Sequence, residues 1–214
     1  MSGNNGFTTF LFDLDGTLID SVELILSSYR HTMRVHRGTM PTDDVWLAGL
    51  GTPLWVQFRH FTNDPAEIDA MVATYREHNH AHHDRMVRPY DGVAEAVAAL
   101  ARRGPLGVVT SKLHASAERG LRLCGLERHF RVIVGADDVE HPKPDPEPVE
   151  RALASLDADP ARTVFVGDSP HDMAAGRAAG VATAAVLWGP FPREHLAPEH
   201  PTHWLGAPAE LLAL

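Results

Sequence analysis

The chain has 214 residues with 28 acidic and 19 basic side chains, which give it a formal net charge of −9. A hydrophobic content of 44% and a charged content of 22% are typical of a globular protein and exclude a disordered one. The acidic balance argues against nucleic acid as a main partner, because a phosphate backbone requires a basic surface. At roughly 150 residues per domain, the length allows one domain, or a core with a smaller insertion.

Neither the first six residues nor the apolar runs of the chain predict a membrane protein or a secreted one. Residues 1–6 are polar and uncharged, unlike a signal peptide, and the longest apolar run spans only residues 181–188. The single cysteine, Cys124, permits no internal disulfide and is expected to be buried beside Leu123. We therefore expect a cytoplasmic monomer or homodimer without a membrane partner.

The first predicted element is a short β-rich strand at residues 8–12, which ends at Asp13. Helical patterns follow at residues 22–35, 54–61 and 66–83, separated by breaks at 38–41, 49–53 and 63–65. No good strand is found between Asp20 and Arg88. The pattern predicts an all-helical insertion after the first strand, and Pro89-Tyr90-Asp91-Gly92 marks the return to the core.

From residue 93 onward helices and strands alternate. Helices are predicted at 93–100, 114–123, 149–156 and 171–179, and strands at 106–109, 132–134, 163–166 and 184–188. The strands are short and apolar on both faces, as in a parallel sheet covered on both sides. This predicts an α/β fold, a doubly wound (Rossmann-like) parallel sheet. The tail, residues 190–208, should follow the surface and end in a short helix at 208–214. The predicted domains are a core of residues 1–19 and 88–214, and a helical cap domain of residues 20–87.

Side chains that can bind ligands or take part in catalysis follow the predicted strands. Ligands of open α/β sheets bind beyond the carboxyl ends of the strands, so these side chains are expected to converge. Clustered carboxylates repel one another and imply a bound hard cation; few oxygen ligands, with room for water and substrate, favour Mg²⁺. The expected site comprises Asp13, Asp15, Thr110, Ser111, Lys112, Lys143 in a Pro-Lys-Pro loop, Asp168 and Asp172.

The basic residues divide unevenly into 17 arginines and two lysines, Lys112 and Lys143. Lysine is a compact point charge with three donors, whereas arginine is a planar fork. Both lysines fall at the expected ligand-binding edge. The pattern therefore predicts that an ammonium is required there, with Lys143 the stronger candidate.

Four ordered motifs resemble the haloacid dehalogenase superfamily of phosphohydrolases, in the subfamily with a helical cap after the first strand. They are Asp13-Leu14-Asp15-Gly16-Thr17, Thr110 after Val108-Val109, Lys143 within His141-Pro142-Lys143-Pro144, and Gly167-Asp168 with Asp172. The resemblance spans nearly the whole chain. It implies that Asp13 is a nucleophile that forms an aspartyl-phosphate.

The remaining roles fit the same chemistry. Asp15 would be the general acid and base, while Thr110 and Lys143 would contact the phosphoryl group. Mg²⁺ would be held by Asp13, the backbone carbonyl of Asp15 and Asp168. Asp172 would orient either metal-bound water or Lys143. Ser111 and Lys112 are further candidates for binding substrate.

The substrate is expected to be a small phosphorylated compound or pyrophosphate. The phrases at residues 8–12, 75–84, 110–114 and 137–141 most resemble the bacterial inorganic pyrophosphatase branch, which makes pyrophosphate the first prediction. A phosphatase of a small phosphomonoester such as phosphoglycolate is the alternative; a sugar-phosphate mutase and an inactive binding module are further ones. The four histidines between His78 and His83 are expected to form a solvated helix end, with phosphate contact as the alternative and a metal site not favoured.

Overall fold

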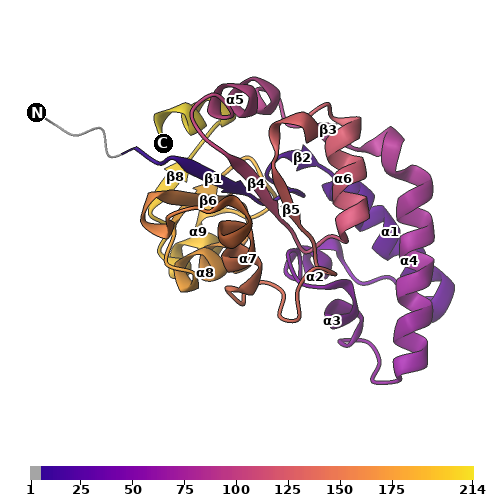
Figure 1. The fold of residues 1–214 in the computed structure, drawn as a ribbon. Helices are drawn as coiled ribbons and strands as arrows, with labels where there is room; N and C mark the ends of the chain where they lie inside the picture. The colour runs from indigo at the N-terminus through magenta and orange to yellow at the C-terminus, as the bar shows by residue number, and fades with distance from the viewer. Residues whose placement is uncertain (1–5) are drawn as a thin grey trace, which may run out of the picture.

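In the computed structural model, which describes residues 6–214, six parallel strands form one sheet in the order β5-β4-β1-β6-β7-β8 (Figure 1). Phe10 in the central strand β1 lies opposite Leu106 of β4 on one side and Val164 of β6 on the other. The strands are β1 Thr9–Phe12, β4 Leu106–Val109, β5 Val132–Val134, β6 Thr163–Gly167, β7 Ala182–Val186 and β8 His203–Leu205. The predicted α/β fold is confirmed. The predicted core domain begins at residue 1, and its first five residues lie outside the described residues.

Helices cover both faces of the sheet. Phe10 and Phe12 belong to one apolar cluster with α5 (Val93–Leu100) and α6 (His114–Leu123). Leu11, which points to the opposite face, packs with α7 (Glu147–Leu156) and α8 (Pro170–Ala178). Since β1 is buried on both faces, it reads as a continuous apolar run.

Four helices lie between β1 and β4 along the chain: α1 Val22–Arg37, α2 Asp43–Leu47, α3 Leu54–Phe58 and α4 Pro65–Met86. The long helices α1 and α4 pack side by side (Figure 1). Helix α1 ends at Gly38, whose left-handed φ of 66° suits a residue without a Cβ, and Asp64 caps α4 by accepting from the Ala66 N–H. The predicted helical insertion is present, and α2 is an additional short helix within it.

Two antiparallel two-residue strands, β2 Ile19–Asp20 and β3 Arg88–Pro89, pair where the chain enters and leaves this helical group. Sequence patterning did not find them, because their definition rests on pairing between distant residues. A mixed apolar cluster also joins Ile25 and Met71 of the helical group to Met173 and Phe191 of the core. We keep the division into a core and a cap domain as a proposal.

Several boundaries differ from those predicted. The strand predicted at residues 184–188 is β7, Ala182–Val186, and the tail contains a short helix, α9 Arg193–Leu196, and the edge strand β8. Among residues 6–214 there are four 3₁₀ helices, η1 Glu127–His129, η2 Pro160–Arg162, η3 Ala197–Glu199 and η4 Pro208–Ala213, the last in place of the predicted terminal helix. Cys124 is half-buried rather than buried, because it follows the end of α6 beside the exposed Leu123; partial burial raises the pKa of its thiol to about 11.

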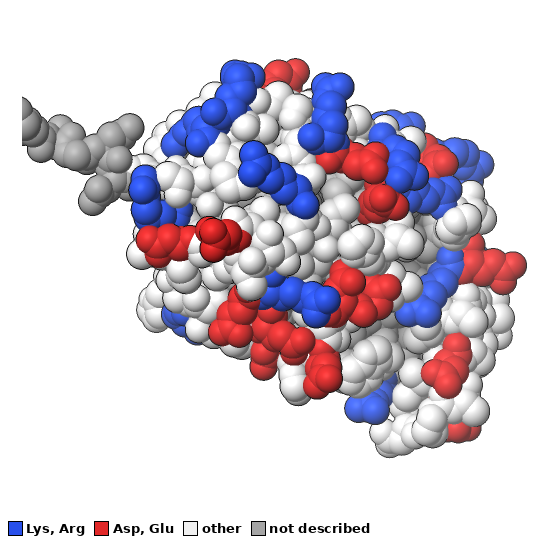
Figure 2. Space-filling view, in the orientation of Figure 1, with Lys and Arg blue, Asp and Glu red and all other residues white. Residues whose placement is uncertain are grey.

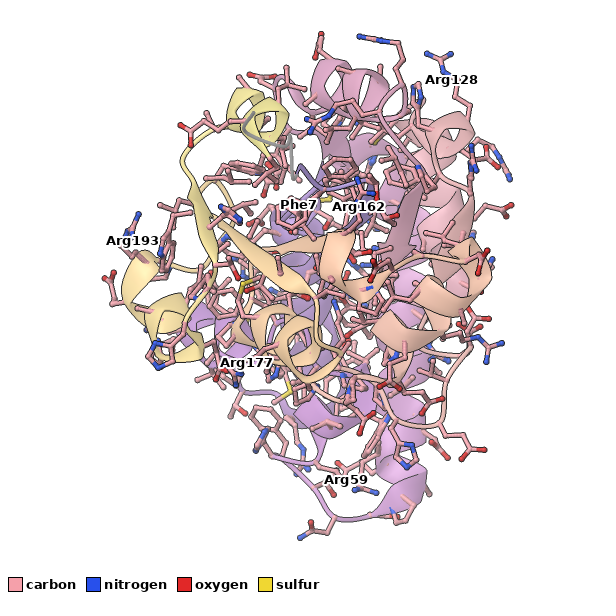
Figure 3. All side chains as sticks on the ribbon, turned by 60° about the vertical axis from the view of Figure 1, so that its left-hand side comes forward. Phe7, Arg59, Arg128, Arg162, Arg177 and Arg193 are labelled. Carbon is pink, nitrogen blue, oxygen red and sulfur yellow. The ribbon has the colours of Figure 1, made fainter. Side chains whose placement is uncertain are left out.

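Acidic and basic side chains are interspersed on the face shown in Figure 2. On another side of the molecule, Figure 3 labels Arg177 and Arg193 beside the C-terminal segment. Arg177 of α8 binds Glu199 at 2.8 Å and fastens the tail to the core, whereas the Arg193 guanidinium lies 4.0 Å from the centre of the Trp204 ring and joins two parts of the tail. Among residues 6–214, no helix is long and apolar enough to cross a membrane.

Candidate active site

Three neighbouring strands bring the predicted residues to one edge of the sheet. Asp13 follows β1, Thr110 follows β4, and Asp168 follows β6, and β1 lies between the other two strands. The Asp13 N–H donates to the Val166 carbonyl at 2.8 Å, and the Thr110 N–H donates to the Val134 carbonyl at 2.9 Å. The strand ladder thus fixes the backbone that carries these side chains.

Lys143 is the centre of a buried ion-pair network. Only 2% of this residue is exposed, and its Nζ donates to Asp13 Oδ1 at 2.8 Å, Asp172 Oδ1 at 2.6 Å and the Val109 carbonyl at 3.3 Å. Burial acts to lower the pKa of Lys143, but the charges of the two carboxylates outweigh it and the pKa is raised. Lys143 is therefore a permanent cation with all three protons engaged.

Asp172 is held from both sides. Its Oδ2 accepts from the Ser169 N–H at 2.9 Å and the Ser169 hydroxyl at 2.7 Å, in a capping box at the start of α8. Its Oδ1 binds Lys143. Asp172 thus contacts Lys143, one of the two partners predicted for it.

Asp168 lies against the glycine of the first motif. Its Oδ1 accepts from the Thr17 hydroxyl at 2.7 Å, and a Cβ on Gly16 would lie 2.5 Å from its Oδ2. Gly16 also has a φ of +88°, so two independent constraints require glycine there. A Cβ on Gly189 would also meet the Asp168 side chain, at 2.5 Å from its Cβ. Glycines thus allow the backbone to close around one carboxylate.

Negative charge exceeds positive charge in this buried centre. Carboxylate oxygens of Asp13, Asp168 and Asp172 lie within 4.8 Å of one another, and this is the only such group of metal-capable side chains among the described residues. Burial, together with the charge of Asp172, raises the pKa of Asp13 to about 7 despite Lys143. Burial and the charges of Asp13 and Asp172 also raise the pKa of Asp168. These residues fit a divalent cation, which would offset their repulsion.

Asp15 stands apart from that group. Lys112 Nζ contacts its two carboxylate oxygens at 2.8 and 3.1 Å, and the Ser21 hydroxyl donates to Oδ1 at 2.6 Å. The side chains of Asp15 and Lys112 are only part-exposed, so this ion pair is less screened than a surface pair. Both lysines of the chain therefore bind aspartates of the first motif: Lys143 binds Asp13 and Lys112 binds Asp15.

Thr110 and Ser111 differ in their surroundings. The Thr110 hydroxyl accepts from the Lys112 N–H at 3.2 Å and keeps its own proton available. The Ser111 hydroxyl donates to the Gly51 carbonyl at 2.6 Å, so it joins the sheet edge to the loop between α2 and α3. Gly51 has a φ of +91°, and a Cβ there would lie 3.0 Å from Ser169 Oγ, so this loop is pressed against the site.

A cleft of about 980 Å³ opens between the helical group and the sheet edge. The sheet edge contributes Asp13, Asp15, Thr110, Ser111, Lys112 and Asp168 to its lining. The helical group contributes Tyr29 and Gln57, which sequence reasoning did not assign, and Tyr75, Asn79 and His83 from the phrase at residues 75–84. Burial and the negative charge of Asp15 raise the pKa of Tyr75, which keeps its phenol neutral. No local motif marks Tyr29 and Gln57, because they reach the site only through the packing of α1 and α3.

The histidine-rich stretch lies within the last part of α4, which continues to Met86. The prediction that these histidines form a solvated helix end is wrong for His83. Its side chain is buried, and its Nδ1 lies 2.9 Å from Asp84 Oδ1. His78 stacks between His31 and His82, with ring centres 4.6 and 4.1 Å apart. The stretch therefore belongs to the packing between α1, α4 and α6.

Three features together define a class of hydrolases that act on phosphorylated compounds. They are the parallel sheet, the order along the chain of the acidic, hydroxyl and lysine residues at its edge, and the helices that follow β1. Residues 10–186 match the family described as haloacid dehalogenase-like hydrolase, and the chain belongs to this superfamily. It is a phosphohydrolase. The superfamily is generally metal-dependent, in agreement with the buried acidic group.

Curated relatives cover almost the whole chain. Pyrophosphatase PpaX of Anoxybacillus flavithermus is 44% identical over 207 residues, which span 96% of this chain and 95% of that protein. Pyrophosphatase PpaX of Halalkalibacterium halodurans is 48% identical over 180 residues, 83% of this chain and 82% of the relative. A solved structure from Lactobacillus plantarum, named for an inferred phosphoglycolate phosphatase activity, has a TM-score of 0.88 at 25% identity and covers 97% of this chain and 99% of its own.

Proposed function

We propose that this phosphohydrolase is Mg²⁺-dependent and hydrolyses inorganic pyrophosphate through an aspartyl-phosphate on Asp13. The observation that carries the proposal is the setting of Asp13 at the floor of the cleft. Lys143 holds its Oδ1, and the side chain lines the cleft. A carboxylate positioned in this way by a buried cation is suited to attack phosphorus in line.

The first step transfers a phosphoryl group to Asp13. An Asp13 oxygen forms the new bond to phosphorus as the bond to the bridging oxygen breaks, and the bridging oxygen leaves with the electron pair. Asp15 donates a proton to that oxygen. Thr110 donates to a phosphoryl oxygen, and Lys143 offsets the charge that gathers on the group. The ammonium of Lys112 passes from Asp15 to the leaving phosphate.

The second step releases the phosphoryl group. Asp15, now a carboxylate, takes a proton from water, and the water oxygen attacks phosphorus of the aspartyl-phosphate. The bond to Asp13 breaks and inorganic phosphate leaves. Asp13 and Asp15 are two residues apart on one backbone segment, and this spacing supports their action as nucleophile and proton carrier at the same phosphorus.

Asp13, Asp168 and the backbone carbonyl of Asp15 would hold Mg²⁺, with Asp172 fixing Lys143 beside them. The ion would supply charge neutralisation for the phosphoryl oxygens. The choice of Mg²⁺ rests on the oxygen-only donor set, which a hard cation prefers.

The assignment of pyrophosphate rests on the relatives named pyrophosphatase, which are 40–48% identical to this chain. Lys112 at the cleft supports it, because the leaving group of pyrophosphate is an anion that attracts an ammonium. The likeness to the Lactobacillus plantarum structure makes phosphoglycolate the alternative substrate.

A phosphate-release assay tests the proposal. We expect turnover of pyrophosphate that requires Mg²⁺, is abolished by chelator, and exceeds the kcat/KM for phosphoglycolate and for hexose phosphates. A higher kcat/KM for phosphoglycolate would replace the substrate and keep the reaction. Absence of turnover with every one of these compounds would refute the proposed function.

A further inference from the structure

Thr17 joins two separate parts of the candidate active site. It is 1% exposed, and its hydroxyl donates to Asp168 Oδ1 at 2.7 Å. Its backbone carbonyl accepts from the indole Nε1 of Trp188 at 3.0 Å. A hydroxyl has a single proton to donate, and the position of the backbone decides where that proton points. The contact that holds the Thr17 backbone therefore bears on the contact that holds Asp168.

Trp188 reaches Thr17 across the end of a third strand. Trp188 follows β7 and Thr17 lies in the turn after β1, while β6 runs between these two strands and has Asp168 directly after it. The bond from the indole to the Thr17 carbonyl therefore passes the strand end that carries Asp168. The Leu187 N–H donates to the Leu205 carbonyl at 2.9 Å, and the Trp188 ring packs against the apolar cluster of the core. The indole is thus held firmly on its own side.

A glycine lets this segment come close. A Cβ on Gly189 would lie 2.5 Å from Asp168 Cβ and 2.7 Å from the Gly16 carbonyl oxygen. Any other residue after Trp188 would push the segment away from the turn that contains Thr17. The backbone after β7 is therefore packed directly against Asp168 and the first motif.

The three buried carboxylates are oriented by different groups. Lys143 donates to Asp13 Oδ1 and to Asp172 Oδ1, whereas Asp168 Oδ1 accepts from the Thr17 hydroxyl. Carboxylates that bind a metal depend on such outer hydrogen bonds for their orientation. Asp168 thus depends on Thr17 in the way that the other two acids depend on Lys143.

We propose that Trp188 is a positioning residue for the divalent cation: its indole N–H fixes the Thr17 backbone, and the Thr17 hydroxyl in turn orients Asp168 as a metal ligand. The proposal rests on the Mg²⁺ site of the proposed function. Trp188 lies outside the four motifs and acts through the loop after β7. The competing role is that Trp188 only fills space in the core, and the two roles differ in what loss of the N–H does to metal affinity.

Calorimetric titration with MgCl₂, without substrate, measures the Kd for Mg²⁺. Trp188→Phe, which keeps an aromatic ring and removes the N–H, should raise the Kd about tenfold. Thr17→Val, which keeps the shape and removes the donor, should raise it by about 10–100-fold, and Thr17→Ser, which keeps the hydroxyl, should stay within about threefold of the wild type. Trp204→Phe makes the same aromatic exchange in β8 and should leave the Kd unchanged.

A double variant separates positioning from packing. The contact between Thr17 and Asp168 is already lost in Thr17→Val, so the further change Trp188→Phe should raise the Kd by less than about twofold more. A packing role predicts a lower Tm in chelator and the same change in Kd with either residue at position 17. An equal rise in both backgrounds, or an unchanged Kd in Trp188→Phe, overturns the proposal.

A measurement on the wild type does not depend on whether the variants fold. Addition of Mg²⁺ should shift the ¹H–¹⁵N NMR signal of the Trp188 indole more than that of the Trp204 indole, because only the first is bonded to the turn that orients Asp168. A Trp188 signal that does not move while Mg²⁺ binds overturns the proposal.

Phosphate release from pyrophosphate, assayed alongside, keeps this proposal apart from the proposed function. The Mg²⁺ concentration for half-maximal rate should rise in Trp188→Phe, while kcat at saturating Mg²⁺ stays within about threefold of the wild type. Turnover with a Kd that Trp188→Phe does not change overturns the positioning role and leaves the proposed function standing. A raised Kd in an enzyme that does not hydrolyse pyrophosphate supports the positioning role and overturns the substrate. A wild type that binds no Mg²⁺ overturns the positioning role and the Mg²⁺ dependence together.

Discussion

Asp13 depends on its neighbours for its reactivity. Its pKa is raised to about 7 by burial, and Lys143 keeps that rise from being larger. Asp13→Asn retains the shape and the contact to Lys143 but removes the attacking oxygen's charge. We expect turnover to fall by at least about a thousandfold, with a Tm equal to or above that of the wild type. Substrate-dependent phosphate release that remains near the wild-type rate would show that another group is the nucleophile.

The two lysines are expected to respond differently to replacement by arginine. Lys143 donates to three acceptors in a buried seat that a planar guanidinium cannot match, so Lys143→Arg should lower kcat by about a hundredfold or more. Lys112 is partly exposed beside Asp15, and Lys112→Arg should cost less than about tenfold. Steady-state kinetics on pyrophosphate measure both. Equal losses would contradict the distinction between the lysines.

The buried acids make metal binding depend on pH. A carboxyl group whose pKa is raised in the folded state stabilises the protein fully at pH values below its ordinary pKa of 3.8. This stabilisation is lost as the pH rises through the folded-state pKa, which is about 7 for Asp13. Mg²⁺ offsets this loss, so its addition should raise Tm more at pH 8 than at pH 6. Asp168→Asn should raise Tm in chelator at pH 8 and remove most of the Mg²⁺ response. An undiminished Mg²⁺ response in Asp168→Asn would place the ion elsewhere.

At the scale of elements, the strands of the core could be predicted because each is apolar on both faces, as Leu11 between Phe10 and Phe12 shows. Strand β8 could not, because His203 and Trp204 are only half-buried and the strand is defined by its pairing with β7. The motif residues at strand ends could also be placed from sequence. Gln57 could not, since nothing in its local sequence indicates that it would line the cleft.

The packing of α1 against α4 should weaken in acid. Burial, with the nearby His82 and His31, lowers the pKa of His78 below its ordinary 6.5. The stability that the neutral ring provides is present above the unfolded-state pKa and is lost as the pH falls through the lower folded-state pKa. Urea unfolding between pH 7.5 and 5 should therefore show falling stability, with a shallower fall for His78→Gln. His80→Gln, at an exposed position on α4, is the matched control; an equal change in both variants would contradict this role.

At the scale of the whole molecule, the helical group and the core share an apolar cluster. Ile25, Tyr29 and Met71 of the helical group pack in one cluster with Met173 of α8 and Phe191 of the C-terminal segment. The loop at Gly51 adds a hydrogen bond from Ser111. Separating the two parts would expose this cluster to water, which ties the stability of one part to that of the other.

We therefore expect residues 20–87 to unfold together with the rest of the chain, in one calorimetric transition whose calorimetric and van't Hoff enthalpies agree. Met173→Ala should destabilise both parts together by about 2–5 kcal/mol, the usual cost of truncating a fully buried methionine. Leu123→Ala, at an exposed position on α6, should change stability by less than about 0.5 kcal/mol. Two separate transitions, only one of them shifted by Met173→Ala, would show that the cap is thermodynamically independent and that the cleft between the parts opens without unfolding the core.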